Sequence, residues 1–400
     1  MPECGASAYN PIMRAIGNIS LVVYVLGQYF LQRLGLRHQP PEVQKYYVHG
    51  LHALDAMFGW TRKTRVRGGE HVPRQGPAIF ASNHIEIDDP FVTGALIHDL
   101  SGGIRPGAMM RDDFFKGIPR WMRRVLDPDE VLRLIGAAQI SRHEVTPEQI
   151  EQFVGLLLQG GTFLIYPGRT RSQMGLVFEY RDWIRSPGRT SLFPSLVHTR
   201  DAGLDVPVVP VTRTYNPLTK RSCVAFGQGL YLERGASPAV QREFDYGLVC
   251  AIADLIEVNA PQLLSALLYL RCLHGLSLRA GADELADALR DIIAAVAERN
   301  PARMLDPALV ESPEREVERV IRFLRKRSLL RRNGGRFELN CRAILSIPAS
   351  NAKYGTQNPV KYLANQLIHL RDVTGPVEER VLGRLAPQGS IRPALAAGAY

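Results

Sequence analysis

Short apolar runs alternate with segments of helical periodicity between residues 61 and 235, and this alternation constrains the fold more than any other feature. The runs at 78–81, 163–165 and 206–211 have the length and composition of buried strands. Before the second run, Thr146, Pro147 and Gln149 have the pattern of a capped helix start, which predicts a helix that ends at Gly160. Strands that alternate with helices predict an α/β sheet flanked by helices, with functional sites on loops at the strand ends.

The N-terminal region, residues 1–60, is predicted to be helical and amphipathic. Residues 15–32 carry no charged side chain over 18 positions, whereas a helix needs about 20 apolar residues to cross a bilayer. Apolar side chains recur there at helical spacing, and arginines flank the segment. This predicts a helix that lies in the membrane interface, without a cleaved signal peptide. The alternative is an ordinary core helix that packs on the α/β domain.

The region 236–400 is predicted to be a separate helical domain, because apolar helical stretches at 248–258, 263–276 and 282–297 follow one another with few strand signals. The pattern of residues 314–332 predicts a charged helix, and the turn residues Asn333-Gly334-Gly335 after it predict a hairpin. This arrangement resembles a small winged-helix unit. Its arginines could contact nucleic-acid phosphates, but a solvated basic face is the favoured interpretation.

Composition narrows the class of protein. A formal net charge of +10 favours an anionic partner: phospholipid head groups, a phosphorylated substrate or acidic carrier, or nucleic acid. The five cysteines show no Cys-x-x-Cys pattern and no pairing with histidine, which argues against a zinc site and a disulfide framework and fits a reducing compartment. No phosphate-binding loop, dinucleotide fingerprint or serine elbow occurs, so nucleotide hydrolysis, dinucleotide binding and a serine nucleophile are disfavoured.

His84 and Asp89 are the strongest candidates for chemistry. They lie where the strand 78–81 gives way to a helix start, with Asp89 as candidate N-cap and Pro90 at the first helical position. A neutral imidazole held by a carboxylate can take a proton from an attacking alcohol. The alternative is that these polar residues only cap the helix.

Three further blocks follow in order: 135–142, which ends in Arg142; Tyr166-Pro167-Gly168-Arg169-Thr170-Arg171-Ser172; and Val206–Val211. Together with the His-x4-Asp pair, these blocks resemble the glycerolipid acyltransferase family. Gly168–Arg171, the block at 187–190 and the segment Asn358–Leu370 are most similar to glycerol-3-phosphate acyltransferases. The resemblance is specific over residues 65–230, and it implies a mixed sheet flanked by helices, with an acyltransferase domain at 61–235.

The resemblance implies a role for each matching residue. His84 would be the general base and Asp89 its orienting partner, Arg142, Arg169, Arg171 and Arg189 would bind the phosphate of glycerol 3-phosphate, and Pro210 and Val211 would wall the acyl pocket. The acyl donor would be acyl-CoA or acyl carrier protein, and no metal and no further cofactor is expected. The enzyme would work at the cytoplasmic face of a membrane, as a peripheral or monotopic protein on an anionic surface, and nucleic acid is not an expected partner.

The chain departs from the family pattern at one position. Family members carry a glutamate in the third block, and here that position falls on Tyr166 or on Gly168. The missing glutamate leaves open a non-catalytic membrane-binding member of the family. A second alternative is an acyltransferase that acts on lysophosphatidate or another lysolipid, because the first block, with Asn83 before His84, resembles the lysophosphatidate branch of the family.

Overall fold

The structure is a computed structural model. It describes residues 58–86, 88–111, 138–140, 146–168, 171–177, 192–233, 235–276, 279–348 and 354–383, preceded by Val23, Gly27, Phe30, Leu31, Leu34, Gly35, Leu36, His52 and Asp55.

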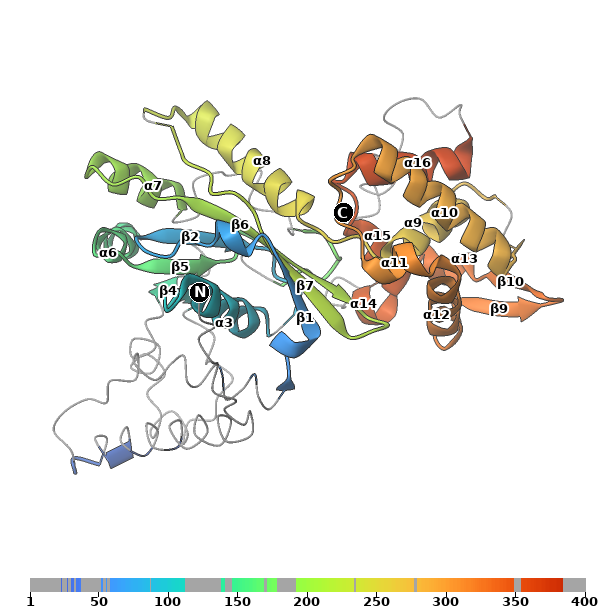
Figure 1. Ribbon diagram of the computed structural model, residues 1–400, viewed down its shortest axis with the longest axis horizontal. Helices are drawn as coiled ribbons and strands as arrows, with labels where there is room; N and C mark the ends of the chain where they lie inside the picture. Colours follow the sequence, from blue (N-terminus) through green and yellow to red (C-terminus); the bar gives the residue numbers. More distant parts are fainter. Residues whose placement is uncertain are drawn as a thin grey trace, which may run out of the picture.

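A seven-stranded sheet forms the centre of the first half of the chain (Figure 1). Its strands pair in parallel except β6 and β7, which are antiparallel, so the sheet is mixed and the predicted fold class is confirmed. In spatial order the strands are β1 (Thr64–Arg67), β7 (Arg221–Phe226), β6 (Val208–Asn216), β2 (Ala78–Ser82), β5 (Thr162–Ile165), β3 (Gly107–Arg111) and β4 (Ala138–Ile140).

Helices cover both faces of this sheet. Successive side chains of a strand point to opposite faces, so the apolar strand β2 contributes to a hydrophobic cluster on each side. Ala78 and Phe80 of β2 pack in one hydrophobic cluster with α3 (Asp89–Ser101). Ile79 and Ala81 pack in a second cluster with helices of the opposite face. These helices are α6 (Pro147–Leu158), α7 (Leu192–Asp201) and α8 (Pro238–Asp254).

The helix starts predicted at Thr146 and at Asp89 are both present, and the second is shifted by one residue. Thr146 caps α6, and Gln149 completes the predicted capping box. Helix α3 has Asp88 at the N-cap position and Asp89 as its first residue, so the prediction that Asp89 is the cap was wrong by one residue. The shift leaves the Asp89 carboxylate inside the first turn, where it can face the preceding loop.

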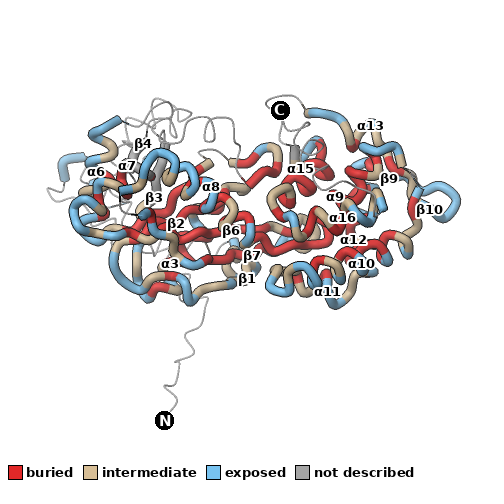
Figure 2. The backbone as a smooth tube through the Cα atoms, turned by 90° about the horizontal axis from the view of Figure 1, so that it is seen from above, coloured by how far each residue is buried: buried red, intermediate tan, exposed pale blue. Residues whose placement is uncertain are grey.

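The second half of the chain is mainly helical (Figure 1). Its buried residues continue the cluster that lies under α6, α7 and α8 (Figure 2). The predicted boundaries at residues 60 and 235 stay predictions. The helices are α9 (Ala260–Leu273), α10 (Ala282–Arg299), α11 (Pro307–Glu311), α12 (Pro313–Arg325), α13 (Cys341–Ile344), α14 (Tyr354–Gln357), α15 (Pro359–Asn365) and α16 (Arg371–Leu382), and two short 3-10 helices, Thr61–Lys63 and Gly69–His71, flank β1.

The charged helix and hairpin predicted at 314–339 are both present. The hairpin pairs β9 (Leu330–Asn333) with β10 (Arg336–Leu339), and β10 also pairs with β8 (Arg279–Ala280). The helix is shorter than predicted, because α12 ends at Arg325 and Ser328 takes a left-handed backbone with φ of 56°. The last residues of the predicted helix form β9 instead.

Cys272 of α9 and Cys341 of α13 form a disulfide, with their Cα atoms 5.3 Å apart. The sequence argued against a disulfide framework, and it gave no indication of this one bonded pair, beside which Cys223 and Cys250 are free thiols. The two residues are separated by 69 positions, so their approach depends on the packing of α13 against α9, which spacing along the chain does not reveal.

None of the helices in the described part of the chain combines the length and the apolar composition that a bilayer crossing needs. The interfacial helix predicted at residues 15–32 lies outside the described residues except for four positions. All four, Val23, Gly27, Phe30 and Leu31, are helical.

A buried carboxylate in α8 predicts a pH-dependent stability. Burial raises the pKa of Asp245 to about 7, and its Oδ1 accepts no hydrogen bond from a described residue. Since the folded pKa lies above the unfolded value, the native state binds the extra proton, and stability falls as pH rises from about 4 through 7. We expect Asp245→Asn to increase the free energy of unfolding at pH 8 by about 1–3 kcal/mol.

Urea unfolding of the wild type and of Asp245→Asn at pH 5 and pH 8 measures this effect. Glu243→Gln is the matched control, because Glu243 is exposed on the same helix. A gain of equal size at both pH values, or in both variants, would contradict the assignment to the Asp245 carboxylate.

Candidate active site

His84 lies at the edge of the sheet where the parallel strands β2 and β5 end. It follows β2 by two residues, and β2 pairs in parallel with β5 and with β6. The carboxyl ends of β2 and β5 therefore meet at the same edge, which is where α/β sheets build their sites. The loops after β2 and β5 carry the first and third sequence blocks, and the structure brings them together.

The His84 ring is held by Asp89. Its Nδ1 lies 2.9 Å from Oδ2 of Asp89, and the His84 side chain is 18% exposed while that of Asp89 is fully buried. The same Oδ2 accepts hydrogen bonds from the backbone N–H groups of Ile85 at 2.6 Å and Glu86 at 2.8 Å. The carboxylate thus fixes both the loop and the ring, and Nε2 is the nitrogen left to face a substrate.

Arg213 of β6 completes this arrangement. Its Nη1 donates to Oδ1 of Asp89 at 2.9 Å and to Oδ1 of Asp88 at 2.7 Å, and its Nη2 donates to the other oxygen of Asp88 at 3.3 Å. Burial lowers the pKa of this guanidinium, but Asp88 and Asp89 together raise it above its usual value. Because Arg213 binds Oδ1 of Asp89, the buried carboxylate has a cationic partner, and its Oδ2 stays available to His84.

Sequence reasoning missed Arg213, and one signal could have found it. The residue continues an apolar strand directly after the run 206–211, where a charged side chain is costly unless it is paired. The side chain of Asn83 connects the loop after β2 to the backbone of Arg213: it donates to the Arg213 carbonyl at 3.0 Å and accepts from the Arg213 N–H at 2.8 Å. Both contacts span 130 positions.

Tyr166 stands where the family pattern places a glutamate in one of the two alignments, and it contacts His84. The two rings stack with centroids 4.4 Å apart and planes 30° apart. The loop of this block is also bonded through its backbone to the loop that carries His84, since the N–H of Ser172 donates to the His84 carbonyl at 2.7 Å. An aromatic face against the imidazole can stabilise the positive charge that develops during proton abstraction.

A half-buried glutamate, Glu86, follows His84 by two residues. Burial, and next the charges of Asp89 and Asp88, raise the pKa of Glu86, while Arg213 and Arg171 oppose this shift. Of the arginines predicted to bind phosphate, the half-buried Arg171 is therefore close enough to act on the acidic cluster beside His84. Arg142, Arg169 and Arg189 lie outside the described residues.

Pro210 and Val211 lie inside β6 and are buried. Val211 packs in the cluster under α3, and Pro210 pairs with Ala81 of β2. Their role as a wall of the acyl pocket stays a prediction.

The C-terminal segment holds the third block in place. Asn365 of α15 donates to the carbonyl of Met174 at 2.9 Å across 191 positions. Gly175 has a left-handed backbone with φ of 88°, and a Cβ there would lie 1.9 Å from the carbonyl oxygen of Tyr362. Only glycine fits this crossing, so the loop that follows Arg171 is packed directly against α15.

Two hollows lie near these elements. One, of about 10 Å³, is behind the site between Asn83, Arg213 and Gly175 and has room for about one water molecule. The other, of about 790 Å³, lies between β7 and α12 and includes neither His84 nor Asp89. The candidate active site is therefore identified from the geometry of His84 and Asp89, and not from the larger of these two hollows.

Comparison with known proteins supports the class of protein that this site defines. Residues 63–214 match the family model described as Acyltransferase, and this segment contains His84, Asp89, Tyr166, Arg171 and Arg213. The match supports the prediction of an acyltransferase domain in this part of the chain. A comparison with curated protein sequences finds no match.

Among solved structures, the chain is similar to the crystal structure of the 1-acyl-sn-glycerophosphate (LPA) acyltransferase PlsC from Thermotoga maritima. The identity is 16% and the TM-score is 0.35, over 60% of this chain and 92% of that chain. A likeness of this size carries no argument about the acceptor.

Proposed function

We propose that the protein is an acyltransferase that moves a fatty acyl group from a thioester to a hydroxyl of glycerol 3-phosphate. The observation that carries the proposal is the contact of His84 Nδ1 with the fully buried Asp89 carboxylate, which two backbone N–H groups and Arg213 hold in place. The match of residues 63–214 to the acyltransferase family supports the reaction type.

In the proposed reaction, Nε2 of His84 takes the proton from the acceptor hydroxyl as its oxygen attacks the thioester carbonyl. The carbon–sulfur bond breaks, and the leaving thiolate takes this proton from Nε2, which returns His84 to its neutral form. Asp89 keeps the proton of the neutral ring on Nδ1 and offsets the charge of the imidazolium. The acyl group passes directly to the acceptor, without a covalent enzyme intermediate.

Glycerol 3-phosphate is proposed as the acceptor because two of the parts most similar to glycerol-3-phosphate acyltransferases lie close together: Asn365 of the C-terminal segment donates a hydrogen bond to the carbonyl of Met174, two residues after the third block. The phosphate would bind to arginines of this region, of which Arg171 is beside the site. A guanidinium offers two parallel donors that match two phosphate oxygens.

Transfer of labelled acyl groups from acyl-CoA and from acyl carrier protein, to glycerol 3-phosphate and to lysophosphatidate, tests the proposal. Product with glycerol 3-phosphate supports it and identifies the donor. Product with lysophosphatidate alone would move the reaction to the next acylation step. Absence of product from every pairing would favour the non-catalytic alternative and point to the missing glutamate.

Reversal of the charge at Arg171 is expected to weaken the binding of glycerol 3-phosphate selectively. We expect Arg171→Glu to raise KM for glycerol 3-phosphate by about 10- to 100-fold, since a hydrogen bond to a charged group contributes about 1.5–3 kcal/mol. KM for the acyl donor should change far less. Arg74→Glu is the control, because Arg74 is exposed in the loop before β2. Equal effects on the two substrates would refute a selective phosphate role.

Membrane association at the cytoplasmic face is part of the proposal. Large apolar side chains are exposed in the N-terminal region, with Val23 64% exposed and Leu34 and Leu36 each 72% exposed. Such side chains can enter the boundary between head groups and acyl chains, and the excess of basic residues favours anionic lipid. Sedimentation of the full chain with anionic vesicles, and not with neutral ones, is the expected result.

A further inference from the structure

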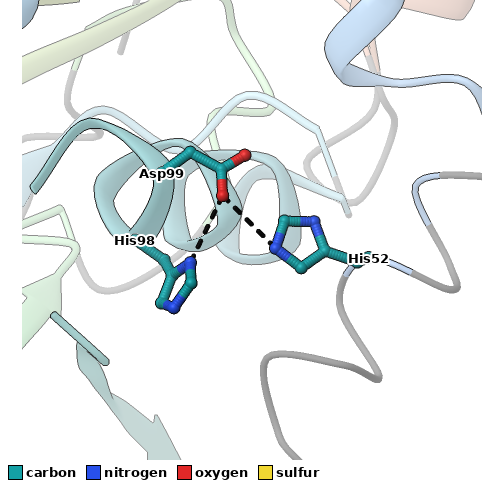
Figure 3. Close-up of side chains that lie close together, drawn as sticks. All are labelled: His52, His98 and Asp99. Atoms are coloured by element: carbon teal, nitrogen blue, oxygen red, sulfur yellow. Dashed lines mark hydrogen bonds and ion pairs between the residues drawn. The ribbon is translucent and has the colours of Figure 1, made fainter. Parts of the chain in front are cut away.

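Three side chains distant from His84 in the sequence meet at the end of α3 (Figure 3). His98 and Asp99 belong to the last turn of this helix, and His52 comes from the segment before the sheet. Nδ1 of His98 and Nε2 of His52 each lie 3.3 Å from the same oxygen, Oδ1 of Asp99. No pattern in the sequence connects them, because 46 positions separate the two histidines and the absence of Cys/His spacing argued against a zinc site.

The spacing of these atoms suits a metal ion. A tetrahedral zinc ion holds nitrogen and oxygen ligands at about 2.0–2.1 Å, which places neighbouring ligand atoms about 3.3 Å apart. Both nitrogen–oxygen distances in this cluster have that value. All three ligand atoms lie within 4.8 Å of one another, so a small side-chain rotation closes the remaining gap between the imidazoles.

The electrostatics of the cluster favour a cation. Among the described residues, Asp99 has no ion pair with a lysine or an arginine. The cluster also lies at the C-terminal end of α3, where the helix dipole stabilises positive charge.

Access to the cluster leaves room for a fourth ligand. The side chain of His52 is 15% exposed and that of His98 is 23% exposed, while Asp99 is 49% exposed. Three protein ligands and one open position are what a zinc ion needs when water completes its coordination.

We propose that His52, His98 and Asp99 form a binding site for a divalent transition-metal ion of the zinc class, separate from the His84 site. His52 would bind through Nε2, His98 through Nδ1 and Asp99 through Oδ1. The ion would fasten the segment that carries His52 to the end of α3, and would replace two hydrogen bonds by three coordinate bonds.

Titration of the chelator-treated, tag-free full chain with Co²⁺ tests the proposal, because four-coordinate Co²⁺ absorbs visible light far more strongly than the hydrated ion. We expect one saturable site per chain, and displacement of Co²⁺ by Zn²⁺. Calorimetric titration with Zn²⁺ gives the affinity independently. Neither readout requires acyltransferase activity, so failure of the metal site and failure of the proposed function are distinguishable.

Substitutions test whether His52, His98 and Asp99 are the ligands of the bound ion. His52→Ala and His98→Ala should each weaken Zn²⁺ binding by about tenfold or more, since loss of even an outer-shell partner of a metal ligand has an effect of this size. Asp99→Asn provides a third variant of nearly unchanged volume in case an alanine variant fails to fold. His71→Ala is the control, because His71 is also a histidine beside a carboxylate, 3.9 Å from Glu70.

Two results would overturn the proposal. One is the absence of saturable Co²⁺ and Zn²⁺ binding in the wild-type protein, which would leave the three residues as a hydrogen-bonded cluster. The other is an equal loss of affinity in His71→Ala and in the variants of the cluster, which would identify the binding as nonspecific capture by surface histidines.

Discussion

Replacing His84 with alanine is expected to lower the rate of acyl transfer by about 100- to 10,000-fold, the usual contribution of a general base. His84 is part-exposed at the edge of the sheet, and its Nδ1 is engaged by Asp89. Loss of the ring removes the proton acceptor while the backbone contacts of Asp89 with Ile85 and Glu86 remain. The effect should therefore fall on kcat, with the fold intact by circular dichroism.

The assay is initial-rate transfer of labelled acyl groups under saturating donor. His71→Ala serves as the control for loss of an imidazole elsewhere on the surface. Asp89→Asn should also reduce kcat, because an amide can turn its N–H toward the ring and favour the wrong tautomer. Full activity in His84→Ala would eliminate the general-base mechanism.

The largest expected effect on stability belongs to Arg213. Its side chain is 5% exposed, and Asp88 and Asp89 are 19% and 0% exposed. Arg213→Met would leave two carboxylates without their cation, and removal of one partner from a buried ion pair typically destabilises a protein by about 3–5 kcal/mol. We expect a decrease of this size in the free energy of unfolding, measured by urea denaturation, together with loss of activity.

Two variants separate this effect from simple loss of an arginine. Arg221→Met replaces an exposed arginine at the start of the neighbouring strand β7 and should change stability by less than about 0.5 kcal/mol. Arg213→Lys keeps the charge but lacks the planar fork that reaches both carboxylates, so an intermediate loss is expected. A stable, active Arg213→Met variant would contradict the role given to this residue.

Local patterns predicted the parts of the site that are close in sequence. The strand at 78–81, the helix start at residues 89–90 and the five-residue spacing of His84 and Asp89 together predicted a held imidazole, and the structure has this contact. The capping box of α6 was predictable for the same reason, because all of its groups lie within four residues.

Contacts that depend on strand register could not be predicted in this way. Asn83 and Arg213 meet because β2 lies beside β6, and the stacking of Tyr166 on His84 requires β5 on the other side of β2. The disulfide of Cys272 with Cys341 was missed because it depends on helix packing. In each case the sequence shows the side chain but not its partner.

The crossing of Gly175 with Tyr362 bears on how the protein is made. The loop beside His84 is held by a glycine contact and a hydrogen bond to a helix that the ribosome delivers almost two hundred residues later. The strands and α3 can assemble as the chain emerges, but the wall of the site after Arg171 reaches its final position only when α15 has been synthesised. The nascent chain therefore lacks the finished geometry around His84 during most of its translation, and a fragment that ends near residue 230 would stop at that unfinished stage.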